Sequence, residues 1–156
     1  MQIHSLGLED FSEEEYSLIG IHTALEDFKL AYFLNKYLNI SFSKSRKDLN
    51  FEKEEKKTSF SIYSYSSKKY DFDWFLIANS SKRENQTESN ELLLTSETKS
   101  YLIPEKKKVD FFIKISGDAE YNFVINTVDN IKKIDQVITS YLIDKNSLKS
   151  KDFLIF

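Results

Sequence analysis

The residues that could do chemistry in this chain are few, and a histidine is the first of them. His22 stands where an alternating apolar segment meets a helical pattern. An imidazole at such a junction could orient a ligand or act as a general base. No serine or second histidine stands at a defined spacing to it, and His4 lies in the N-terminal segment. We therefore interpret His22 as a structural residue.

Two pairs of carboxylates could bind a cation or transfer protons. Glu26 and Asp27 are adjacent in the first turn of a predicted helix, where the helix dipole favours acidic side chains without any metal. Glu105 and Asp110 flank three consecutive lysines and could form a polar cluster with them. As a general acid–base pair they lack a supporting residue. The sequence predicts no catalytic residue, no metal site and no cofactor, and it favours a non-catalytic protein while leaving an enzyme as the third alternative.

Composition narrows the function classes further. The chain has 156 residues and no cysteine, which excludes disulfides, thiolate catalysis and cysteine-based metal sites. Three glycines and one proline are too few for the glycine-rich loops that bind phosphate. No apolar run reaches the roughly 18 to 20 residues that a membrane helix needs, and the N-terminus lacks the layout of a signal peptide. We expect a cytoplasmic protein that does not enter a membrane.

Scattered basic residues raise the alternative of RNA binding. They are Lys44, Arg46, Lys47, Lys68, Lys69, Lys82, Arg83, Lys106 to Lys108, Lys149 and Lys151. If several converged beside exposed Tyr63, Tyr65 or Tyr70, they could follow a phosphate backbone while the rings stack on bases. The net charge of -3 and the absence of an RNP-type or GxxG motif make this the second choice.

The first half of the chain predicts a strand followed directly by a helix. Alternation from Ser17 to Thr23 predicts the strand, and apolar residues at three- and four-residue spacing predict a helix from about Ala24 to Leu38. Thr23 and Glu26 have the spacing of a capping box, and Asn39 is the expected C-terminal cap. A second strand should contain Ile40 and Phe42. A hairpin should join segments 59–65 and 72–78.

The second half predicts a further strand, helix and strand. The alternation from Val109 to Ile115 predicts the most secure strand, and Asp118 could cap a helix from about Ala119 to Lys133. Segment 136–143 is apolar on both faces, which is typical of an interior strand. Residues 46–57 and 80–91 are predicted to be flexible loops, and residues 1–14 a mobile arm.

These elements predict the fold class α+β in a single domain of residues 1–156. The expected architecture is a mainly antiparallel sheet with two helices on one face, in a ferredoxin-like or related arrangement of two β-α-β units. The second face should carry Tyr63, Tyr65, Phe112 and His22, and it needs a cover. One candidate cover is the C-terminal segment from Phe153 to Phe156, which could dock on its own domain or on a partner.

One run of residues resembles a family signature. The segment Ile103-Pro104-Glu105-Lys106-Lys107-Lys108-Val109-Asp110-Phe111 is similar to the motif of the IPExxxVDY family of uncharacterised Bacteroidetes proteins, with Phe111 in place of the final Tyr. Segments 25–36 and 148–156 are similar to that family too. The resemblance implies a bacterial source and a cytoplasmic location, and it assigns no activity.

The sequence therefore favours a non-catalytic interaction or regulatory domain that binds another protein or itself, with a homodimer as one form. An RNA-binding protein that uses scattered Lys, Arg and exposed Tyr is the alternative. The residues we select as candidates for binding are Tyr63, Tyr65, Glu105, Asp110, Phe153 and Phe156.

Overall fold

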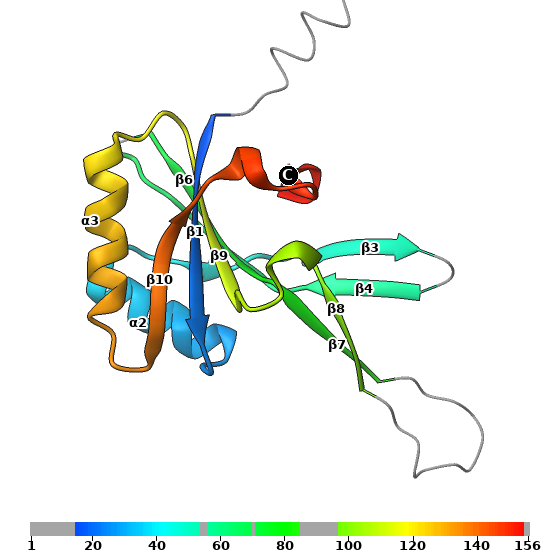
Figure 1. Ribbon diagram of the computed structural model, residues 1–156. Helices are drawn as coiled ribbons and strands as arrows, with labels where there is room; N and C mark the ends of the chain where they lie inside the picture. The colour runs from blue at the N-terminus through cyan, green and yellow to red at the C-terminus, as the bar shows by residue number, and fades with distance from the viewer. Residues whose placement is uncertain (1–14, 54–55, 70, 85–96, 155–156) are drawn as a thin grey trace, which may run out of the picture.

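A computed structural model describes residues 15–53, 56–69, 71–84 and 97–154 (Figure 1). The predicted N-terminal arm lies outside these residues.

The centre of the molecule is a six-stranded antiparallel sheet within the described residues. Its order is β10-β1-β9-β6-β5-β2, and each strand is antiparallel to its neighbours. The strands are β1 (Tyr16–Thr23), β2 (Ser43–Lys44), β5 (Ile62–Ser66), β6 (Asp73–Ala78), β9 (Phe111–Ser116) and β10 (Val137–Ile143). The α+β class and the mainly antiparallel sheet are confirmed.

Both helices of the described chain lie on one face of this sheet, as predicted (Figure 1). They are α2 (Asp27–Leu38) and α3 (Tyr121–Lys132). Their buried residues, among them Leu34 and Val128, form one core with Ile19, Ile113 and other strand residues that alternate toward the helices. Burial of apolar area on this scale is the main contribution to folding stability.

The helix ends differ in part from the predicted caps. Asn39 ends α2 in the left-handed conformation, with φ at 55°, as predicted. The capping box is wrong, because Glu26 is the N-cap and makes no side-chain cap bond. Thr23 is buried at a β-bulge, where its hydroxyl donates to the Gln136 carbonyl and accepts from the Leu25 N–H. The predicted Asp118 cap is also wrong, because α3 begins after Glu120.

Two hairpins extend from the second side of the sheet (Figure 1). β3 (Leu49–Lys53) pairs with β4 (Lys56–Phe60), and β7 (Ser80–Glu84) pairs with β8 (Glu97–Tyr101). The prediction of a loop at 46–57 is therefore wrong for 49–53 and 56–57, while residues 54–55 lie outside the described chain. That of a loop at 80–91 is wrong for 80–84, and residues 85–91 lie outside the described chain.

The second face of the sheet carries its own apolar core. Phe112 and Leu18 point into it from the sheet, and two irregular segments cover them. The first cover is segment 101–109, through Leu102, Ile103 and Val109, and the second is the C-terminal segment 145–154, through Leu148 and Leu154. The sheet is thus buried on both sides.

The prediction that 136–143 is an interior strand is wrong, because β10 is the first strand of the sheet. The sheet also contains two further strands, β5 and β2, beyond the four that a ferredoxin-like plan needs. The ferredoxin-like detail stays a prediction.

Candidate functional site

The segment with the family-like motif is held in place by a buried asparagine. Asn79 is fully buried, and its Nδ2 donates to the carbonyls of Lys106 at 2.8 Å and Val109 at 2.9 Å. Its Oδ1 accepts from the Ile103 N–H at 2.8 Å. A buried side-chain amide whose NH₂ group donates two hydrogen bonds and whose oxygen accepts one is held rigidly. Asn79 therefore holds segment 103–109 against the second face of the sheet.

Glu105 fastens this segment to the C-terminal segment. Its Oε2 accepts from the backbone N–H groups of Lys149 at 2.6 Å and Ser150 at 2.9 Å. Partial burial raises the pKa of Glu105, but the hydrogen bonds from its own backbone, from Ser150 and from Lys149 outweigh burial and lower the pKa below its usual value. Glu105 is thus an ionised structural acceptor.

Asp110 holds a different part of the chain. Its Oδ2 accepts from the Thr23 N–H at 2.9 Å, at the point where β1 leads toward α2. The structure therefore does not join Glu105 and Asp110 in one acid–base site. Each carboxylate bonds to backbone N–H groups of a distant segment.

The C-terminal segment docks on its own domain as far as residue 154. Leu154 is fully buried, and its carbonyl accepts from Lys114 Nζ at 2.6 Å. Lys114 is itself fully buried in β9, and its ammonium lies 5.0 Å from the ring centroid of Tyr16. Phe153 is 44% exposed and Phe156 lies outside the described residues.

The two candidate tyrosines lie on the helix face, so their predicted place on the second face is wrong. Tyr63 is only 8% exposed and belongs to the core beneath the helices, and Tyr65 packs against the same core. Burial, then the charges of Asp27 and Asp48, raise the pKa of Tyr63. Lys44 Nζ lies 5.4 Å from its ring centroid. Tyr63 therefore offers little of its side chain to a ligand.

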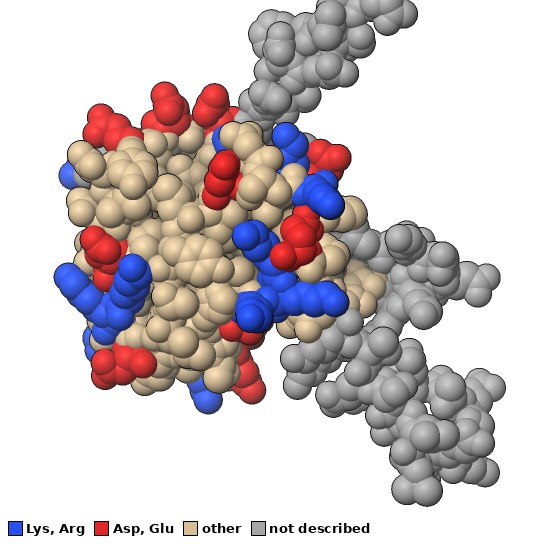
Figure 2. Space-filling view, in the orientation of Figure 1, with Lys and Arg blue, Asp and Glu red and all other residues tan. Residues whose placement is uncertain are grey.

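The outer edge of β10 forms the first candidate site. Its Ile138 is 77% exposed, and Tyr141 is 36% exposed. The Tyr141 hydroxyl and His22 Nε2 lie 2.9 Å apart, so the histidine bonds to a phenol on the same edge. Burial raises the pKa of Tyr141. Figure 2 shows uncharged side chains over the middle and left of this side of the molecule, with basic side chains gathered to the right of them and further charged side chains along the other borders.

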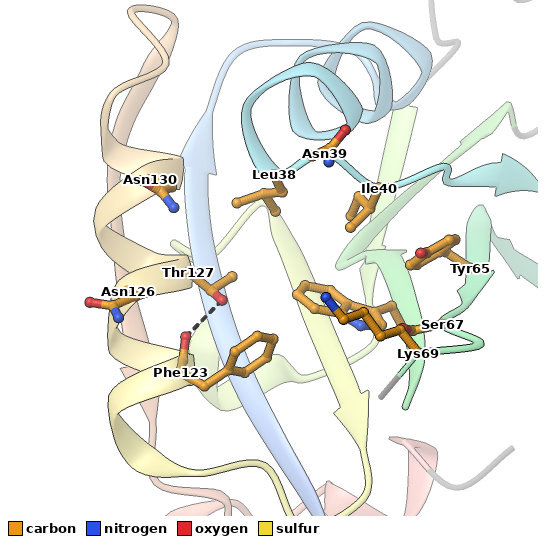
Figure 3. Close-up of a pocket in the computed structure, with 11 residues that line it drawn as sticks. Leu38, Asn39, Ile40, Tyr65, Ser67, Lys69, Phe123, Asn126, Thr127 and Asn130 are labelled. Atoms are coloured by element: carbon orange, nitrogen blue, oxygen red, sulfur yellow. Dashed lines mark hydrogen bonds between the residues drawn. The ribbon is translucent and has the colours of Figure 1, made fainter. Parts of the chain in front are cut away.

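A cavity of about 440 Å³ forms the second candidate site. It lies where the end of α2 and the middle of α3 approach the β5–β6 hairpin (Figure 3). Its apolar lining is Leu38, Ile40, Tyr65, Trp74 and Phe123, and its polar lining is Asn39, Ser67, Lys69, Asn126, Thr127 and Asn130. Thr127 Oγ1 donates to the Phe123 carbonyl at 2.9 Å, which turns that hydroxyl toward the helix backbone.

The described residues show neither a metal-binding cluster nor a membrane-spanning helix. The described residues contain no group of three or more His, Asp or Glu side chains placed to bind a metal ion. No helix in the described ranges is long and apolar enough to cross a membrane. No family model matches this chain, and no curated protein matches it.

Sequence reasoning missed several of these residues. A charged residue between Ile113 and Ile115 in the most secure strand was a visible signal for buried Lys114. Asn122, Asn126 and Asn130 recur at four-residue spacing in α3, a signal for a polar rim on one helix face. Asn79 stands in a polar run, and only its burial reveals its role.

Proposed function

We propose that this protein is a non-catalytic interaction domain that binds a second copy of itself through the outer edge of β10. One observation carries the proposal. The seven residues of β10 contain no charge, proline or glycine, although the strand lies at the edge of the sheet. A long uncharged edge strand presents backbone N–H and C=O groups to any strand that can align with it.

The opposite edge of the same sheet, formed by β2, is protected against strand addition. There β2 is only two residues long, and one of the two is Lys44, which is exposed. Short length and an edge lysine are the usual protections against strand addition. β10 has neither of these protections; its irregularity is the β-bulge opposite Thr23, from which Ile138 stands out into solvent. Burial of such a side chain stabilises an interface by roughly 1.5–3 kcal/mol.

The sequence of β10 suits pairing with itself. An antiparallel pair related by a two-fold axis at Ser140 places Thr139 opposite Tyr141, with Leu142 of each copy toward the bulge residue Ile138 of the other. Aliphatic pairs and pairs of an aromatic with a β-branched residue are favourable across antiparallel strands. No like charges meet inside the paired strands, because β10 has none. A second copy is therefore the partner we propose.

The test measures oligomeric state by sedimentation equilibrium and by light scattering after gel filtration. We expect the full chain to be dimeric and Ile138→Lys to be monomeric with an unchanged circular dichroism spectrum. Ser43→Lys is the matched control, because it adds a lysine to the exposed opposite edge strand β2. It should stay dimeric. A monomeric wild-type chain, or a dimeric Ile138→Lys, would contradict the proposal.

RNA binding remains the alternative function. Burial of Tyr63 removes part of the stacking surface on which it depends. A gel shift with structured and single-stranded RNA at physiological salt separates the two functions. A shift at micromolar protein that Ile138→Lys leaves unchanged would favour RNA binding.

Membership of the IPExxxVDY family and a cytoplasmic location are also proposals. The structural roles of the motif support the former. Ile103 and Val109 are buried in the second core, while Glu105 and Asp110 each hold a distant backbone segment. Such roles give a reason for these residue types to occur together at this spacing.

A further inference from the structure

We propose that the cavity between α2, α3 and the β5–β6 hairpin is a binding site for a small planar heteroaromatic ligand that carries an anionic group, the size and chemistry of a mononucleotide. The proposal is independent of pairing through β10. Its volume of about 440 Å³ is in the range of small-molecule sites, which is roughly 300–1,000 Å³.

The rings in the cavity supply surfaces for a planar ligand. Tyr65, Trp74 and Phe123 all line it, and the last two meet edge to face with centroids 6.0 Å apart. Tyr65 and Phe123 remain half-buried, so a ring that enters the cavity would cover apolar surface that now faces solvent. Stacking of a base on an aromatic side chain is worth about 1–3 kcal/mol.

The rim carries side-chain amides, which can both donate and accept hydrogen bonds. Asn126 and Asn130 stand one turn apart on α3, and Asn39 lies at the end of α2 (Figure 3). An amide side chain donates and accepts at once, which matches a ring edge with adjacent donor and acceptor groups. A purely hydrocarbon ring has no such edge, so it could not form hydrogen bonds with these amides.

The helix sequence itself supports a role for this rim. Asparagine is unfavourable inside a helix, yet α3 has Asn122, Asn126 and Asn130 along one face. A residue choice that weakens its own element is expected at functional or strained sites. Two of the three line the cavity, and Asn122 does not.

The charge of the lining favours an anionic ligand. Lys69 is the only residue with a charged side chain among the described residues that line the cavity. The chain as a whole has a net charge of -3, so a cavity with one lysine and no carboxylate in its lining differs from the average surface. An ammonium group at the rim attracts phosphate or carboxylate.

The test uses Trp74, the only tryptophan of the chain, as a fluorescent reporter inside the cavity. The full-length protein is titrated with AMP, GMP and UMP, with adenosine, with inorganic phosphate and with a single-stranded RNA. We expect a saturable change in emission with at least one mononucleotide, weaker binding of its nucleoside, and no change with phosphate alone.

Substitutions of lining residues test whether the mononucleotide binds in this cavity. The double substitution Asn126→Ala and Asn130→Ala should weaken mononucleotide binding at least tenfold, while alanine should not weaken the helix. Lys69→Gln should reduce the preference for AMP over adenosine. Asn122→Ala is the matched control from the same stripe and should bind like the wild type.

Several results would overturn the proposal. These are the absence of a saturable change with all three mononucleotides, equal binding of phosphate alone, binding of the RNA without the mononucleotides, and unchanged affinity in the double variant. Ile138→Lys should bind the mononucleotide normally, so failure of the β10 interface and failure of this site give different results.

Discussion

At the scale of single residues, a few polar side chains connect segments that are far apart in the chain. Glu105 holds the backbone of Lys149 and Ser150, Asp110 holds that of Thr23, and Asn79 holds both ends of segment 103–109. A hydrogen bond to a charged group contributes more than a neutral one, about 1.5–3 kcal/mol where it is shielded from water. These residues therefore decide where the irregular segments lie.

Glu105→Gln should weaken the protein in a pH-dependent way. The pKa of Glu105 is lower in the folded state than in the unfolded chain, so its ionised form stabilises the folded state. That stabilisation is present above the unfolded pKa of about 4.3 and is lost as the pH falls through the lower, folded pKa. We expect a difference in the free energy of unfolding of only about 1 kcal/mol, because water screens the charge of this exposed side chain.

Urea denaturation of both proteins from about pH 7 to about pH 3 measures this difference. The two unfolding curves should approach each other at the acid end. A difference that is constant over the whole range would show that the charge of Glu105 does not fasten the C-terminal segment.

At the scale of elements, the C-terminal segment is part of the fold as far as Leu154. Leu154→Ala removes a fully buried side chain from the second core, and such substitutions cost about 2–5 kcal/mol. Phe153→Ala should cost clearly less, because the neighbouring Phe153 is 44% exposed. Thermal unfolding of the two variants tests this directly. An equal loss of stability in both would contradict the observed packing.

The strands β3 and β4 show that a charged composition does not exclude a strand. Segment 46–57 is rich in Lys and Glu, a composition typical of a solvated loop. β3, which lies in this segment, pairs antiparallel with β4, and Leu49 lies opposite Phe60, which is buried in the second core. A two-stranded ribbon anchored at one end tolerates charges along its length. Its pairing partner, rather than its own composition, makes it a strand.

At the scale of the whole molecule, the sheet is shared by two cores. The first core packs the helices on one face, and the second packs segments 101–109 and 145–154 on the other. The same strands supply side chains to both cores, so loss of one core removes packing from the sheet that supports the other. We expect a single cooperative unfolding transition.

Leu154→Ala tests this cooperativity from a distance. The substitution lies in the second core, whereas Trp74 lies in the first. Tryptophan fluorescence and circular dichroism should therefore report the same lowered midpoint in the variant. A midpoint of Trp74 fluorescence that stays at its wild-type value would show that the two cores unfold separately.

The sequence by itself determined the elements whose periodicity is strong. The strands around Ile19 and Ile113, the two helices, their common face and the hairpin between β5 and β6 all follow from side-chain spacing, which depends on local backbone geometry. The left-handed cap at Asn39 is local as well.

Only the tertiary structure decided how these elements are arranged and which surfaces stay open. Segment 137–143 is apolar on both faces, so its spacing could not show that it lies at an edge. The sequence likewise could not show which side of β5 faces the helices, and hence that Tyr63 is buried. The cavity joins residues from α2, α3 and the hairpin that are far apart in the chain. Contacts of this kind depend on packing between distant segments, which local periodicity does not encode.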